Sequence, residues 1–239
     1  MPSKCFLLLL LLGLHGPAGD SSVSERHIFQ TRISRRATAR YLLSLPAGYA
    51  DSKRRWPLIL FLHGGSGRGD DIDLVSRYGP PAIAAKRPDY PFIVLSPQCP
   101  AGEIWSDADL LVSLLDDVVA HHRVDPERIY LTGMSMGGRG VWYLAYKHPD
   151  RFAAIVPVNA YAPITDWAKG LKTMPVWVFH GDRDTVVPLS DSEDMVRALR
   201  AVGNDAKFTI LPGRGHDIAD VYDLPELYEW MLAHRRPHP

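Results

Sequence analysis

The chain has 239 residues, of which 46% are hydrophobic and 23% charged, and its formal net charge is zero. This length favours one domain of ordinary size, or at most two small ones, with enough apolar material for a sizeable core. No basic run stands out, which argues against nucleic acid or another polyanion as a partner. The histidines show no spacing typical of a metal-binding helix, such as His-Glu-x-x-His.

The first residues have the layout of a secretory signal peptide. Lys4 precedes an apolar run from Cys5 to Leu14, and small residues follow from Gly16 to Gly19. This run is short for a membrane span, which needs about 20 apolar residues. We therefore expect residues 1–19 to be removed on export, and residues 20–239 to form one domain of a secreted or periplasmic protein without stable membrane insertion. The alternative is a short membrane anchor.

Short apolar runs recur along the rest of the chain. One or two edge strands are expected within residues 21–45, before Pro46. Further strands are expected at residues 57–62, 92–95, 129–131, 153–158, 176–179 and 208–211. Continuous apolar runs of this length suit strands that are buried on both faces, as in a parallel sheet.

Segments with helical spacing lie between these runs. From Asp107 to His122 the apolar residues form one stripe, and Ser106 with Asp109 resembles a capping box at its start. Pro225 suits the first turn of a last helix. Strands that alternate with helices predict an α/β fold, with a mostly parallel central sheet and right-handed crossovers.

The segment from Gly133 to Gly137 matches Gly-x-Ser-x-Gly, with Ser135 at its centre. It follows a predicted strand and precedes a segment with helical spacing, which is the context that a nucleophile elbow needs. The sharp turn strains the serine backbone, so the residues two positions away must be small. A helix N-terminus also favours the negative charge of an alkoxide. We expect Ser135 to be a nucleophile.

A serine hydroxyl needs a base to take its proton. His216 follows the last predicted strand on a loop with Gly213 and Gly215, and we expect it to be that base rather than a solvated loop residue. A carboxylate must accept the other ring N–H, and we favour Asp184. Asp182 is the competitor, expected instead to bond local backbone in a turn.

The anionic intermediate of acyl transfer needs two N–H donors. One is expected from the backbone of Met136, and the other from Gly65 or Ser66 in the loop after residues 57–62. A phosphate cradle is the alternative for this loop, but it lacks the Gly-Lys-Ser/Thr ending of a P-loop. His63 is expected to orient the loop rather than to catalyse.

These segments together resemble a group of exported bacterial α/β-hydrolases. The group includes carboxylesterases, prolyl-oligopeptidase-like predicted peptidases, and relatives of feruloyl esterases and polyhydroxybutyrate depolymerases. The resemblance covers most of the chain after the signal, through residues 57–69, 92–100, 124–154, 176–188 and 215–217. It implies the α/β-hydrolase fold, a triad of Ser135, Asp184 and His216, and no metal or organic cofactor.

Arg139 departs from the pattern of this group, where a neutral residue is expected. It either biases the pocket toward acidic groups or forms a structural ion pair. Cys99 would be the one cysteine left after signal removal, and we expect it to be a small buried hydrophobe.

The segment between Ala160 and Met174 is too short for a lid domain, so the site is expected to be open. An open site suits small-molecule esters or esters carried by a polymer, such as acylated carbohydrate or soluble polyester. Trp105, Tyr161 and Trp167 are candidate lining residues, and core or surface packing is the alternative for each.

The leading hypothesis is hydrolysis of carboxylic esters through an acyl-enzyme. A serine peptidase acting on short peptides is the alternative, because a triad of this kind serves both reactions. An inactive binding protein on a hydrolase fold is a further alternative, although every expected site residue is present.

Overall fold

The computed structural model describes residues 36–87, 89–162 and 164–236. The predicted signal peptide, residues 1–19, and most of the segment expected to hold edge strands lie outside the described residues. From Ala37 onward the chain forms one compact unit.

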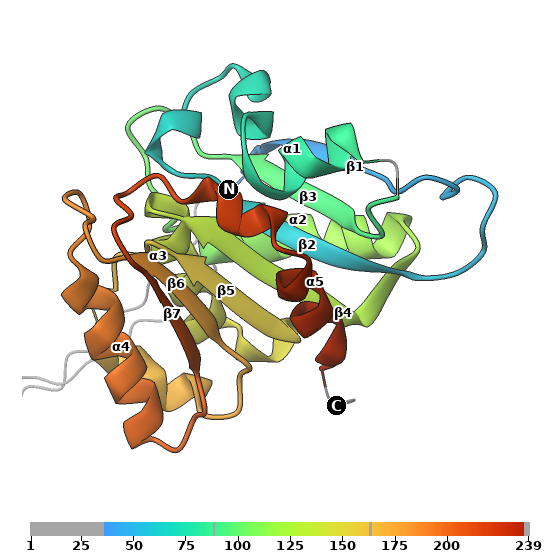
Figure 1. Ribbon diagram of the computed structural model, residues 1–239. Helices are drawn as coiled ribbons and strands as arrows, with labels where there is room; N and C mark the ends of the chain where they lie inside the picture. The colour runs from blue at the N-terminus through green and yellow to red at the C-terminus, as the bar shows by residue number, and fades with distance from the viewer. Residues whose placement is uncertain (1–35, 88, 163, 237–239) are drawn as a thin grey trace, which may run out of the picture. The chain divides into compact units, whose positions relative to one another are not determined.

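A seven-stranded sheet lies at the centre of the described residues (Figure 1). Its spatial order is β1-β3-β2-β4-β5-β6-β7; β1 is antiparallel to β3, and all other neighbours are parallel. The strands are β1 (Arg40–Ser44), β2 (Trp56–Leu62), β3 (Ile93–Gln98), β4 (Val124–Met134), β5 (Ala154–Val158), β6 (Trp177–Gly181) and β7 (Lys207–Leu211). The predicted parallel sheet and the edge strand before Pro46 are confirmed.

Helices cover both faces of this sheet. The α-helices are α1 (Gly79–Lys86), α2 (Ala108–His121), α3 (Met136–Lys147), α4 (Leu189–Ala201) and α5 (Pro225–Ala233). Short 3₁₀ helices are η1 (Gly65–Gly67), η2 (Ile72–Ser76), η3 (Pro149–Arg151), η4 (Thr165–Leu171) and η5 (Ala219–Asp223). Pro225 opens the last helix, as predicted.

The side chains of β2 point alternately to the two faces of the sheet and so contribute to two separate core layers. Leu58 and Leu60 face the cluster that contains side chains of α2, α3 and α4. Ile59 and Phe61 face the opposite cluster, with α1, η5 and α5. Successive side chains of a strand point to opposite faces, so a strand that is apolar throughout is covered on both sides.

The capping residue predicted for α2 was wrong by one position. Asp107, not Ser106, is the N-cap, and its Oδ1 accepts a hydrogen bond from the N–H of Leu110 at 3.0 Å. The helix therefore begins at Ala108, because the carboxylate of Asp107 reaches an N–H that has no acceptor within the helix.

The strand order fixes where a site lies. From β2 the chain crosses to β3 on one side, whereas from β4, the other neighbour of β2, it crosses to β5 on the opposite side. Loops leaving adjacent strands in opposite directions open a crevice at the carboxyl ends of the strands. Among the described residues, the segment between β5 and β6 forms only the short η4 and no lid domain, as expected.

Gly137 is the tightest point between α3 and β2. A Cβ on Gly137 would overlap the backbone carbonyl of Leu62, and one on Gly133 would lie 2.5 Å from the same oxygen.

Gly137→Ala is therefore expected to lower the free energy of unfolding by at least about 3 kcal/mol, because backbone must move. Urea unfolding measures this. Gly170→Ala is the control, since its Cβ would lie 3.4 Å from Tyr146. Equal stability of the two variants would contradict the prediction.

Candidate active site

Ser135 occupies the turn between β4 and α3 in a strained conformation. Its φ is 58° and its ψ is −120°, a positive φ that is rare outside glycine. Its N–H donates to the carbonyl of Val158 at 2.9 Å, and its carbonyl accepts from the N–H of Arg139 at 3.0 Å. Backbone bonds on both sides hold this conformation, so the hydroxyl is presented at the carboxyl end of the sheet.

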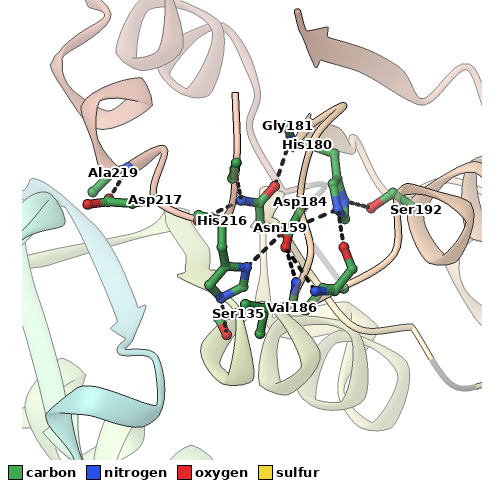
Figure 2. Close-up of polar contacts among 12 residues, drawn as sticks. Ser135, Asn159, His180, Gly181, Asp184, Val186, Ser192, His216, Asp217 and Ala219 are labelled. Atoms are coloured by element: carbon green, nitrogen blue, oxygen red, sulfur yellow. Dashed lines mark hydrogen bonds and ion pairs between the residues drawn. The ribbon is translucent and has the colours of Figure 1, made fainter. Parts of the chain in front are cut away.

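The structure brings Ser135, His216 and Asp184 together from three separate loops. Nε2 of His216 lies 2.9 Å from Oγ of Ser135, and Nδ1 lies 2.7 Å from Oδ2 of Asp184. Figure 2 shows the imidazole between the other two side chains. A carboxylate only accepts, so the ring proton is on Nδ1, and Nε2 is free to accept the serine proton.

Asp184 is a buried carboxylate, and both of its oxygens accept hydrogen bonds. Its side chain is inaccessible to solvent, and its Oδ1 accepts from the N–H groups of Val186 at 2.8 Å and Val187 at 2.9 Å. Burial by itself would raise the pKa of Asp184. The hydrogen bonds from Val187, His216 and Val186 outweigh burial and hold this pKa below its ordinary value. The carboxylate is therefore ionised when it faces His216.

Asn159 fixes the loop that carries His216, and our sequence reasoning missed it. Its Nδ2 donates to the carbonyl of His216 at 2.7 Å, and its Oδ1 accepts from the N–H of Gly181 at 2.9 Å. Its φ is 41°, a conformation that asparagine tolerates better than most residues. A polar residue directly after a buried strand was the available signal.

Asp182 plays the structural part expected of it, with a different partner. Its Oδ1 accepts from the N–H of Gly213 at 2.6 Å. We expected a bond within its own turn, but Gly213 lies on the next loop, which carries His216. Sequence proximity could not reveal this contact, because β6 and β7 are paired only in the folded chain.

His63 holds the loop after β2 from inside the protein. Its Nε2 accepts from the N–H of Cys99 at 3.0 Å, so its proton is on Nδ1, which donates to the carbonyl of Gly64 at 2.6 Å. Trp105 Nε1 donates to the carbonyl of His63 at 2.9 Å. Burial lowers the pKa of His63. Its position agrees with the orienting role expected of it.

The loop after β2 lies against Ser135. A Cβ on Gly64 would come within 3.6 Å of the Cβ of Ser135. Gly65 and Ser66 follow, at the start of η1, and Met136 starts α3. The first N–H groups of a helix have no acceptor within the helix. Of the three residues predicted as oxyanion donors, Met136 directly follows Ser135, and Gly65 and Ser66 directly follow Gly64; their role remains a prediction.

Tyr78 supports the same loop, and no sequence motif pointed to this residue. Its hydroxyl accepts from the N–H of Gly64 at 2.5 Å, and its ring meets Phe61 edge-on with centroids 5.7 Å apart. Burial raises the pKa of Tyr78 above its ordinary value. The phenol is thus protonated at neutral pH.

The three predicted lining residues differ in their surroundings. Trp105 is 5% exposed and lines a cavity of about 420 Å³ beside β3 and α2, whose lining includes none of the Ser135, Asp184 and His216 group. Trp167 is 7% exposed and stacks on Tyr146. Tyr161 is 46% exposed. Tyr161 is thus the most accessible of the three; a lining role remains a prediction for all of them.

The two other residues singled out by sequence have simple surroundings. Cys99 is buried, as expected, and burial raises the pKa of its thiol to about 11. Arg139 is half-buried, and within the described ranges it forms no ion pair. The structural ion pair considered for Arg139 is therefore not found among these residues.

Neither a metal centre nor a membrane helix is found in the part of the chain that the structure describes. No three or more His, Cys, Asp or Glu side chains gather there in a group that could hold a metal ion. None of the described helices has both the length and the apolarity to cross a bilayer.

The sheet order, the strained serine turn and the adjoining loops define the class as the α/β-hydrolase fold. A family model described as phospholipase/carboxylesterase matches residues 96–226, more than half of the chain. The chain belongs to this phospholipase/carboxylesterase family.

Individual relatives agree with this assignment. NocK of Nocardia uniformis subsp. tsuyamanensis is 26% identical over 79% of this chain and 56% of its own length. Acyl-protein thioesterase 1 homolog 2 of Dictyostelium discoideum is 27% identical over 49% of this chain and 58% of its own length. The solved structure of a thermostable esterase is 27% identical, with a TM-score of 0.71 over 82% of this chain and 59% of that one. This chain thus spans little more than half of each relative.

Acid should destabilise the fold through two buried histidines. Burial lowers the pKa of both His63 and His180, so below their ordinary pKa of 6.5 the unfolded chain binds more protons than the folded one. The free energy of unfolding should therefore fall with pH below about 6.5, by at most about 1.4 kcal/mol per pH unit for each histidine. Urea unfolding at several pH values measures this, and a stability that is flat between pH 7 and 5 would contradict it.

Proposed function

We propose that this protein hydrolyses carboxylic esters through an acyl-enzyme on Ser135. The observation that carries the proposal is the unbroken line of hydrogen bonds from Asp184 through His216 to Ser135, with distances of 2.7 and 2.9 Å. Membership of the phospholipase/carboxylesterase family and the likeness to a thermostable esterase support it.

In the proposed acylation step, Nε2 of His216 takes the hydroxyl proton while Oγ of Ser135 forms a bond to the ester carbonyl carbon. The carbonyl oxygen becomes an oxyanion, which accepts from the N–H of Met136 and of Gly65 or Ser66. When the carbon–oxygen bond breaks, the imidazolium returns its proton to the departing alcohol. Asp184 stabilises the imidazolium and stays ionised.

Deacylation repeats these steps with water as the nucleophile. His216 takes a proton from water while the water oxygen attacks the acyl carbon. When the bond between the acyl carbon and Oγ of Ser135 breaks, His216 returns the proton to Oγ. The products are a carboxylic acid and an alcohol. Every step uses only protein side chains, backbone N–H groups and water.

For the substrate we propose an acylated carbohydrate, a polyester or a small aryl or alkyl ester. The short segment between β5 and β6 supports this, because η4 packs through the buried Trp167 and Leu171 and leaves the described site without a lid domain. We also retain export as a proposal, which rests on the pattern of residues 1–19.

The decisive experiment is a panel of p-nitrophenyl acetate, butyrate and ferulate with aminoacyl-anilides. We expect turnover of the esters, and Ser135→Ala should reduce it on the order of 10⁴-fold or more without loss of fold. A fluorophosphonate probe should label the wild type and not the variant. Cleavage of anilides alone would favour the peptidase alternative, and an unlabelled, folded wild type would favour an inactive binding protein.

Asp184→Asn tests the carboxylate separately from Asp182. An amide at residue 184 can no longer hold the proton on Nδ1 of His216, so we expect kcat to fall on the order of 10⁴-fold. Asp182→Asn should cost far less, since the carboxylate of Asp182 bonds loop backbone, at the N–H of Gly213, rather than His216. Steady-state kinetics on one ester measures both, and a larger loss at Asp182 would reverse the assignment.

A further inference from the structure

A second buried imidazole, that of His180, lies near the same carboxylate oxygen of Asp184 that faces His216. Nε2 of His180 is 3.6 Å from Oδ2 of Asp184, and neither side chain is accessible to solvent. Figure 2 shows the carboxylate between the two histidines. The proposed mechanism assigns no part to His180, although burying an imidazole beside a carboxylate requires specific partners.

The partners of His180 fix one neutral tautomer. The carbonyl of Val187 lies 3.0 Å from Nε2 and only accepts, so the ring proton is on Nε2. Nδ1 then accepts the hydroxyl proton of Ser192, in α4, at 2.7 Å. Burial lowers the pKa of His180, which keeps the ring neutral at neutral pH.

His180 and Asp184 are tied together through the backbone of Val187. The carbonyl of Val187 accepts from His180, while its N–H donates to Oδ1 of Asp184 at 2.9 Å. The imidazole thus fixes the orientation of Val187, and Val187 fixes the rotation of the carboxylate. This leaves Oδ2 directed at Nδ1 of His216.

We infer that His180 is a positioning residue for the ester hydrolysis proposed above, on which this inference rests. Its Nε2–H holds the segment from Asp184 to Val187 so that Oδ2 meets His216. Without that donor the buried carbonyl of Val187 loses its partner and the segment must shift to find another. A carboxylate displaced by about 1 Å would orient His216 poorly, and errors of that size cost up to about 100-fold in rate.

Two amide substitutions separate the two ring nitrogens. The side-chain nitrogen of His180→Gln reaches as far as Nε2 and keeps a donor for Val187, whereas that of His180→Asn reaches only as far as Nδ1. We expect the Gln variant to keep kcat within about threefold of the wild type and the Asn variant to lose about 10- to 100-fold, with KM nearly unchanged in both. Equal kcat in the two variants would overturn the inference.

Asn204→Ala controls for loss of stability alone. Asn204 is buried and its Nδ2 donates to the carbonyls of Leu171 and Met174, outside the group around Asp184. The variant should unfold at lower urea concentration and retain kcat. If it lost as much kcat as His180→Asn, the effect of His180 would be general destabilisation, and the inference would fail.

A readout without substrate separates this inference from the proposed function. The proton between His216 and Asp184 should give a low-field NMR resonance, assigned by its loss in Asp184→Asn. We expect this resonance in the wild type and His180→Gln, and a broadened or shifted one in His180→Asn. An unchanged resonance in His180→Asn would contradict the positioning role of His180. A wild type that shows the expected resonances but hydrolyses no ester would refute the function and leave the positioning role standing.

Discussion

The site depends on one backbone constraint, the tight turn at Ser135 between β4 and α3. Backbone hydrogen bonds hold the positive φ of Ser135, and α3 packs directly on β2, with the carbonyl of Leu62 filling the space where a side chain on Gly137 would lie. The same contact brings the start of α3 next to the loop after β2. This close approach of backbone to backbone therefore helps to orient Ser135 and brings its neighbouring loops together.

The site depends secondly on the groups that keep the buried carboxylate of Asp184 ionised. A carboxylate with no solvent access is costly to ionise, and here two backbone N–H groups and two imidazoles surround it. Both backbone N–H donors, those of Val186 and Val187, come from the segment between β6 and α4. Local backbone geometry thus maintains the negative charge that the proposed mechanism needs beside His216.

The loops at the carboxyl end of the sheet are also joined to one another. Asn159, after β5, bonds the backbone at the end of β6 and in the loop after β7, and Asp182, after β6, bonds the loop after β7 at Gly213. Tyr78 bonds the loop after β2. Residues that face no reacting atom in the proposed mechanism thus set the positions of the residues that do.

The sequence alone determined the α/β class, the parallel strands and the turn at Ser135, because periodicity and glycine spacing act over a few residues. It also marked Asp184 and His216 through their places after strands. It did not determine Asp107 as the cap of α2, the bond from Asp182 to Gly213, or the contacts of Tyr78 and His180. These depend on which strands become neighbours and how side chains pack, and only the tertiary structure decides that.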